Sequence, residues 1–126
     1  MNLIDSSAWI EYLREGQQAS ALEKYLLHPQ SLIVPTLVIF EVYRFLVKKV
    51  GMKEALFAVT QLQKGTLLEL NEEIALYAAE LSLKHQLATA DSIVYASALL
   101  SQAELITLDN DFRGLPSCKV FSAPPN

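Results

Sequence analysis

Cysteine, histidine and glycine are scarce in this chain of 126 residues, and each scarcity excludes a class of site. A single cysteine, Cys118, excludes a disulfide framework and a cysteine-based zinc site. The two histidines, His28 and His85, lack the spacing of a zinc motif. The four glycines are scattered, so the chain has no glycine-rich phosphate loop.

Long apolar runs and a basic N-terminal start are also missing. No apolar segment reaches the length that crosses a membrane, and the first ten residues, MNLIDSSAWI, do not have the pattern of a signal peptide. We therefore expect a cytoplasmic protein with no membrane attachment. With 52% hydrophobic residues, the length predicts one globular domain over residues 1–126.

Positive charge is limited, with 10 lysines and arginines against 14 aspartates and glutamates. The resulting net charge of −4 argues against a nucleic-acid-binding protein of the usual basic kind. That argument loses its force if several of the acids bind a metal ion. The positions of the acids therefore matter more than the sum of the charges.

Short apolar segments alternate with helical patterns along the whole chain. We expect strands over 2–5, 31–35, 66–70, 104–109 and 119–122, and helices over about 6–15, 18–27, 36–50, 52–63, 71–84 and 89–102. The strands are apolar without period-two alternation, which is typical of a parallel sheet that is covered on both faces. The sequence therefore predicts an α/β fold with a central, mainly parallel sheet.

Acidic residues stand where such a sheet would place a site. Asp5 closes the first expected strand, and Asp109 closes the segment LITLD. Ligands of parallel sheets bind beyond the carboxyl ends of the strands, so both carboxylates should emerge at one edge. Asp91 lies in the first turn of a helix, two residues after the expected N-cap Thr89, where the helix dipole favours a carboxylate. Any one of these acids is also typical of a cap or a turn, and only their joint placement favours a site.

A fourth acid, Glu41, interrupts the helical segment TLVIFEVYRFLVKKV, which is apolar almost all round and is expected to be buried. Glu41 shares a narrow stripe of this helix with Arg44 and Lys48, so it either pairs with Arg44 or joins the other acids. Arg44, Lys48, Lys49 and Lys53 form a basic cluster. This cluster is either a solvated helix end or an edge that follows phosphates.

Several carboxylates in one pocket repel each other and are costly to desolvate. A hard divalent cation, Mg²⁺ or Mn²⁺, relieves the repulsion because it prefers oxygen ligands. One or two such ions activate water and stabilise charge on a phosphate oxygen, which favours phosphodiester hydrolysis. Asp111 is more typical of a turn. It comes two residues after Asp109, where the chain already turns away, so its side chain is not expected to reach a metal ion directly. A role through a bridging water molecule stays open.

Four segments occur in the order found in the PIN-domain ribonucleases: LIDSSAWIEYL, LIVPTLVIFE, LATADSIVYASAL and LITLDNDF. Over essentially its whole length the chain resembles this family, above all the VapC toxins of toxin–antitoxin pairs. The resemblance implies a three-layer α/β/α fold and a Mg²⁺- or Mn²⁺-dependent endoribonuclease that cleaves RNA. It also implies a homodimer and inhibition by an antitoxin protein that inserts into the acidic groove.

Carried over to this sequence, the resemblance places the metal-binding and catalytic acids at Asp5, Glu41, Asp91 and Asp109. It places hydroxyl side chains near the metal at Ser6 or Ser7 and at Thr107. One mild departure is the segment ADS, where ADA is common in the family; no catalytic residue is affected.

Two other classes of protein compete with this interpretation. A phospho-acceptor receiver-like domain would need paired acids after the first strand, whereas Asp5 is followed by Ser6. A non-catalytic PIN-fold binding module would be expected to lack one of the four acids. A homodimer has modest support from the sequence, because five aromatic residues exceed what one small core can hide. These are Trp9, Tyr12, Phe40, Tyr43 and Phe45.

Overall fold

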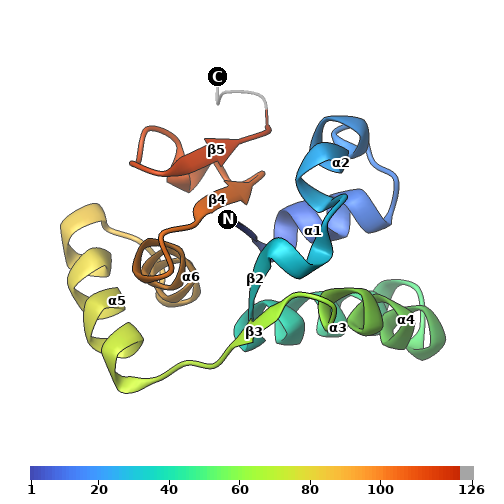
Figure 1. Cartoon of the computed structure of the whole chain (residues 1–126), viewed down its shortest axis with the longest axis horizontal. Coiled ribbons are helices and arrows are strands. Elements are labelled where there is room, and N and C mark those ends of the chain that lie inside the picture. Colours follow the sequence, from blue (N-terminus) through green and yellow to red (C-terminus); the bar gives the residue numbers. More distant parts are fainter. Residues whose placement is uncertain (123–126) are drawn as a thin grey trace.

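A computed structural model describes residues 1–122, which form a five-stranded parallel sheet between two layers of helices (Figure 1). The strands are β1 (Asn2–Ile4), β2 (Leu32–Pro35), β3 (Thr66–Leu68), β4 (Glu104–Thr107) and β5 (Cys118–Val120). The helices are α1 (Ser6–Leu13), α2 (Ala19–Leu26), α3 (Thr36–Lys49), α4 (Met52–Leu62), α5 (Glu72–His85) and α6 (Thr89–Leu100), with 3₁₀ turns at η1 (Pro29–Ser31) and η2 (Asn110–Phe112). The predicted three-layer α/β/α fold with a parallel sheet is confirmed.

The strands lie in the order β3-β2-β1-β4-β5. From β1 the chain moves outward to β2 and β3, and α5 and α6 then return it to β4 on the other side of β1 (Figure 1). The direction of winding therefore reverses between β1 and β4, the point at which open α/β sheets bind ligands. Receiver-type domains have the order 2-1-3-4-5, so this topology removes the support for the receiver-like alternative.

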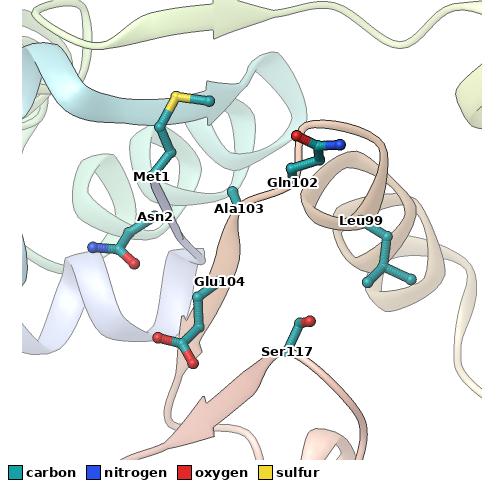
Figure 2. Close-up of a pocket in the computed structure, with 7 residues that line it drawn as sticks. All are labelled: Met1, Asn2, Leu99, Gln102, Ala103, Glu104 and Ser117. Atoms are coloured by element: carbon teal, nitrogen blue, oxygen red, sulfur yellow. The ribbon is translucent and has the colours of Figure 1, made fainter.

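The amino ends of β1 and β4 border a cavity of about 590 Å³ (Figure 2). Its lining consists of Met1, Asn2, Leu99, Gln102, Ala103, Glu104 and Ser117. Because the strands are parallel, this cavity lies at the opposite end of the sheet from the residues that follow β1 and β4. None of the acids predicted for the site lines it.

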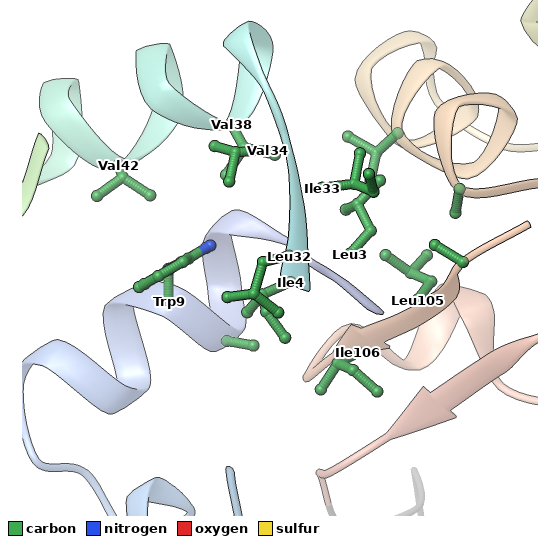
Figure 3. Close-up of a cluster of buried hydrophobic side chains, with 14 of the residues drawn as sticks. Leu3, Ile4, Trp9, Leu32, Ile33, Val34, Val38, Val42, Leu105 and Ile106 are labelled. Atoms are coloured by element: carbon green, nitrogen blue, oxygen red, sulfur yellow. The ribbon is translucent and has the colours of Figure 1, made fainter. Parts of the chain in front are cut away.

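The core lies on both faces of the sheet (Figure 3). Leu3, Ile33 and Leu105 are paired across β1, β2 and β4, and their side chains share the face toward α6. Ile4 and Val34 point to the opposite face, toward α1 and α3. All five are buried. Each fully buried side chain of this size contributes about 1.5–3 kcal/mol of transfer free energy, which holds the strand ends in place.

Helix α3 differs from the expectation of a helix that is buried all round. Its fully buried residues are Val38, Val42 and Leu46, which lie on one face, whereas Phe40 is 61% exposed. The apolar residues of α3 cover more of its circumference than the sheet and α4 can contact. The prediction of a fully buried helix is therefore wrong for the single chain.

The five aromatic residues that were expected to exceed what the core can bury differ in their exposure. Trp9 is only 3% exposed and belongs to the core, so that part of the expectation is wrong. Tyr12, Tyr43 and Phe45 are partly buried and pack against the core. Phe40 is the one that is exposed.

Helices α5 and α6 begin in different ways. Asn71 caps α5, since its side chain accepts a hydrogen bond from the backbone N–H of Ile74 at 2.9 Å. At α6 the N-cap is Ala88, which makes no side-chain cap, and Thr89 is already the first helical residue. The predicted Thr89 cap is wrong, although Asp91 does lie in the first turn.

In residues 1–122 we find no helix with the length and apolar character that a bilayer crossing requires.

Candidate metal centre

Asp5 joins the carboxyl end of β1 to the start of α1. Its Oδ1 accepts hydrogen bonds from the Ser7 hydroxyl at 2.6 Å and from the Ala8 backbone N–H at 3.1 Å, so Asp5 is the N-cap of α1. The side chain is only 7% exposed. Burial raises the pKa of Asp5, the hydrogen bonds from Ser7, Thr107 and Ala8 oppose that rise, and the charge of Asp109 adds to it. Capping and a role in the site are therefore compatible.

The hydroxyl of Thr107 connects the ends of β1 and β4. It is buried, donates to Oδ2 of Asp5 at 2.5 Å and accepts the backbone N–H of Asp109 at 2.9 Å. The Ser7 hydroxyl accepts the backbone N–H of Leu108 at 3.0 Å. Both hydroxyls that were predicted beside the acids thus contact Asp5 and fix the position of Asp109 relative to it.

Three carboxylates come together beyond the end of β4. Oxygen atoms of Asp91, Asp109 and Asp111 all lie within 4.8 Å of one another. Asp109 caps η2 by accepting the backbone N–H of Asp111 at 2.9 Å, and this tight turn brings the Asp111 carboxylate back toward the strand end. The expectation that Asp111 lacks the reach to join the acids is therefore wrong.

Glu41 approaches from α3. It is half-buried and hydrogen-bonded to the Ser6 hydroxyl at the start of α1. Burial is the main reason that the pKa of Glu41 is raised; the charge of Asp5 adds to it and the Ser6 hydrogen bond opposes it. Within residues 1–122 the ion pair that forms is Lys119–Glu104 at 3.4 Å, so the alternative of a Glu41–Arg44 pair is not realised.

The pKa of Asp91 records the convergence of the acids. Burial and the negative charges of Asp109, Asp111, Asp5 and Glu41, in that order, raise it to about 6. A carboxylate whose ionisation is opposed by four others lies in a strongly negative field. The donor set consists of carboxylate oxygens, which are the ligands that Mg²⁺ and Mn²⁺ prefer, so these residues fit a hard divalent cation.

Two buried aromatic residues, which sequence patterns did not single out, hold the loop after β4. Phe112, 1% exposed, packs edge-on against the Tyr95 ring, with 6.0 Å between ring centroids. The Tyr95 hydroxyl donates to the carbonyl of Pro116 at 2.8 Å. Because Phe112 follows Asp111 directly, burying its ring fixes the turn that carries Asp109 and Asp111. The sequence does contain one indication of this contact, namely an aromatic residue, Phe112, at the end of an otherwise polar turn.

A hollow of about 360 Å³ lies beside Glu41, and we call it the phosphate groove. Its lining consists of Ser6, Ile10, Phe40, Glu41, Arg44, Phe45, Lys48 and Lys49. Arg44, Lys48 and Lys49 of the basic cluster thus share a hollow with an acid of the site, whereas Lys53 does not line it. The Arg14 guanidinium lies over the Phe45 ring, 5.5 Å from its centroid, and adds a positive charge that sequence reasoning missed.

The model of the PIN domain family matches residues 3–116, and the chain belongs to this family. The resemblance drawn from the four sequence segments is therefore confirmed. A comparison with curated proteins finds no match.

Solved structures with the same fold extend over nearly the whole chain. A toxin–antitoxin complex from Klebsiella pneumoniae has a TM-score of 0.80 and 24% identity, covering 98% of this chain and 100% of that one. VapC20 from Mycobacterium tuberculosis, a sarcin-ricin loop cleaving toxin, has a TM-score of 0.76 and 16% identity, covering 99% and 100%. VapBC2 from Rickettsia felis, bound to a DNA fragment from its promoter, has a TM-score of 0.73 and 12% identity, covering 96% and 97%. At these identities the similarity establishes the fold.

Proposed function

We propose that this protein is a metal-dependent endoribonuclease that hydrolyses RNA phosphodiester bonds in the cytoplasm as the toxin of a VapBC-type toxin–antitoxin pair. The observation that carries the proposal is the gathering of five carboxylates where the sheet reverses its winding, with the pKa of Asp91 raised by burial and by the charges of the other four. The ribonuclease reading also draws on VapC20, a solved relative that cleaves the sarcin-ricin loop.

The acids divide into two groups by environment. Asp91, Asp109 and Asp111 offer mutually close oxygens and are half-buried or exposed, so they would hold one or two Mg²⁺ or Mn²⁺ ions. Asp5 is nearly fully buried and accepts three hydrogen bonds, which fixes its orientation toward Asp109. When bound, a divalent cation supplies charge neutralisation on the phosphate and activation of a water molecule.

The remaining residues would orient the acids and bind the substrate. Ser6 holds the Glu41 carboxylate, so Glu41 is placed between the acids and the phosphate groove. Arg44, Lys48 and Lys49 would bind backbone phosphates of the substrate, whose negative charge the acid cluster alone would repel. A locally basic groove beside an acidic site explains how a chain of net charge −4 binds RNA.

The direct test is cleavage of single-stranded RNA by the purified protein. We expect cleavage with Mg²⁺ or Mn²⁺ and none after EDTA, because the cation supplies the charge neutralisation and the water activation that cleavage needs. Asp5→Asn should abolish most of the activity while the protein stays folded. Glu54→Gln, an exposed acid outside the cluster, is the control and should behave as wild type. An inactive wild type would favour the non-catalytic binding module, whereas cleavage that persists in EDTA would refute the metal dependence of the nuclease.

The proposal of an antitoxin partner is supported only by the similarity to solved structures. Solved structures with this fold include toxin–antitoxin complexes, two of them bound to DNA. We infer a cognate antitoxin that inserts into the acidic groove and inhibits cleavage. A short neighbouring reading frame whose product co-purifies with this chain and suppresses the nuclease would support the pairing. If no such product is found, the proposed toxin role is contradicted, whereas the proposed nuclease activity is not affected.

A homodimer is the expected assembly, and exposed apolar side chains support it. On α4, Met52 is 60% exposed, Leu56 51% and Phe57 65%, and Val50 before it is 49% exposed. Apolar side chains grouped in this way usually mark an interface. Light scattering at tens of micromolar should give a mass near twice the 14.0 kDa of one chain. A mass of one chain would contradict the dimer.

A further inference from the structure

We propose that Phe40, Tyr43 and Val47 form a pocket for one unpaired base of the RNA, which makes the enzyme selective for single-stranded substrate. This inference rests on the proposed ribonuclease function and adds to it a determinant of substrate structure. The pocket is a second hollow on α3, about 390 Å³ in volume, with Arg44 and Lys48 completing its lining. We call it the base pocket.

The base pocket and the phosphate groove are separated by one row of side chains. Phe40, Arg44 and Lys48 line both hollows, and they follow one another at intervals of four residues along α3. Side chains at this spacing are neighbours on one helix face, and the row is about 12 Å long. On the side of the phosphate groove the parallel row begins with Glu41, which is hydrogen-bonded to Ser6. A chain that crosses this ridge therefore passes directly from the acid site to the base pocket.

The chemistry of the two hollows matches the two parts of a nucleotide. The phosphate groove combines polar and cationic residues, whereas Phe40, Tyr43 and Val47 give the base pocket an apolar wall. Arg44 and Lys48 stand on the ridge between them, where the phosphate next to an inserted base would lie. Aromatic platforms beside cationic grooves are the common way in which proteins bind single-stranded nucleic acid, because every base has a π-face to stack.

Two phenylalanines line the phosphate groove, and they differ in exposure. Phe45 is partly buried against the core, and the Arg14 guanidinium covers its ring at 5.5 Å. Phe40 is 61% exposed and borders both hollows. Exposing a phenylalanine ring to water is unfavourable, so a base that covers it gains the free energy of burial. Phe40 is therefore the stacking residue.

Binding in EDTA tests the base pocket without cleavage. The probes are a fluorescent 12-nucleotide single-stranded RNA, the same strand with abasic nucleotides, and its duplex. For Phe40→Ala we expect the Kd of the single strand to rise about 5- to 150-fold, the range that loss of one stacked base implies. The Kd of the abasic strand and of the duplex should change by less than about twofold, because neither offers a free base to the ring. Phe40→Trp should restore tight binding.

Leu83→Ala is the matched control, since Leu83 is an apolar side chain that is 84% exposed on α5 and lines neither hollow. It should leave binding of all three probes unchanged. Arg44→Ala should weaken the intact and the abasic strand alike, because it removes a phosphate contact. The inference is overturned if Phe40→Ala binds the single strand as wild type does, or if it loses intact and abasic strands equally.

A protein interface at this surface gives a different result. Phe40→Ala would then convert a dimer to a monomer in light scattering while RNA binding stays unchanged, which also overturns the base pocket. Failure of the proposed function is distinguished by the wild type, which would then cleave no RNA with Mg²⁺ or Mn²⁺. If the wild type cleaves RNA and Phe40→Ala cleaves it equally well, only the base pocket is refuted.

Discussion

Replacing Asp109 by asparagine should lower single-turnover RNA cleavage by about 10²–10³-fold, as loss of one charge-stabilising group at a reacting centre typically does. Asp109 is central to the cluster. Its oxygens lie within 4.8 Å of those of Asp91 and Asp111, and its charge also raises the pKa of Asp5. Asparagine keeps the Oδ1 that accepts the backbone N–H of Asp111, so η2 and the fold should survive. The melting temperature should therefore change little.

Asp111→Asn is the comparison that tells the two aspartates apart. Its carboxylate belongs to the same cluster but is exposed, so water can take the place of a lost ligand more easily. We expect a loss of about tenfold in cleavage, or ~1.4 kcal/mol of transition-state stabilisation. Cleavage that falls further for Asp111→Asn than for Asp109→Asn would make Asp111 the principal ligand.

Asp91→Asn should abolish most cleavage and, in metal-free protein, increase stability at neutral and alkaline pH. The folded-state pKa of Asp91 is raised to about 6 from an ordinary value near 3.8, so the folded protein holds this proton more tightly than the unfolded chain. The stabilisation is complete below the unfolded pKa and is lost as the pH rises through about 6. At pH 8 the ionised, half-buried carboxylate costs on the order of 1 kcal/mol after solvent screening, and asparagine removes that cost.

Urea unfolding in EDTA at pH 4.5 and pH 8 measures this effect. The variant should gain stability over the wild type at pH 8 and show a smaller difference at pH 4.5. Glu54→Gln is the matched control, because Glu54 is also the third residue of its helix but lies outside the acid cluster. Adding Mg²⁺ at pH 8 should stabilise the wild type more than the variant, since a ligand that binds the folded state favours it. Equal stability of variant and wild type at pH 8 would mean that the acids do not repel Asp91.

The sequence by itself determined the fold class and the edge of the sheet at which the acids gather. Apolar segments bounded by polar residues predict a parallel sheet, because burial on both faces leaves a mark on every residue of a strand. Asp5 and Asp109 follow such segments, so their common edge follows from strand direction alone. The Asn71 cap was also predictable, since a cap depends on a few neighbouring residues.

Only the tertiary structure decided which side chains meet. The reach of Asp111 depends on η2, whose shape is set by the burial of Phe112 against Tyr95, a contact between residues 17 positions apart. The Arg14 guanidinium over the Phe45 ring connects the end of α1 to α3, and the position of Phe40 between two hollows depends on what packs around α3. The sequence pattern shows that α3 is apolar almost all round. How much of its surface is buried depends on which other helices and strands pack against it. Contacts between distant segments have no local pattern, so no short stretch of sequence records them.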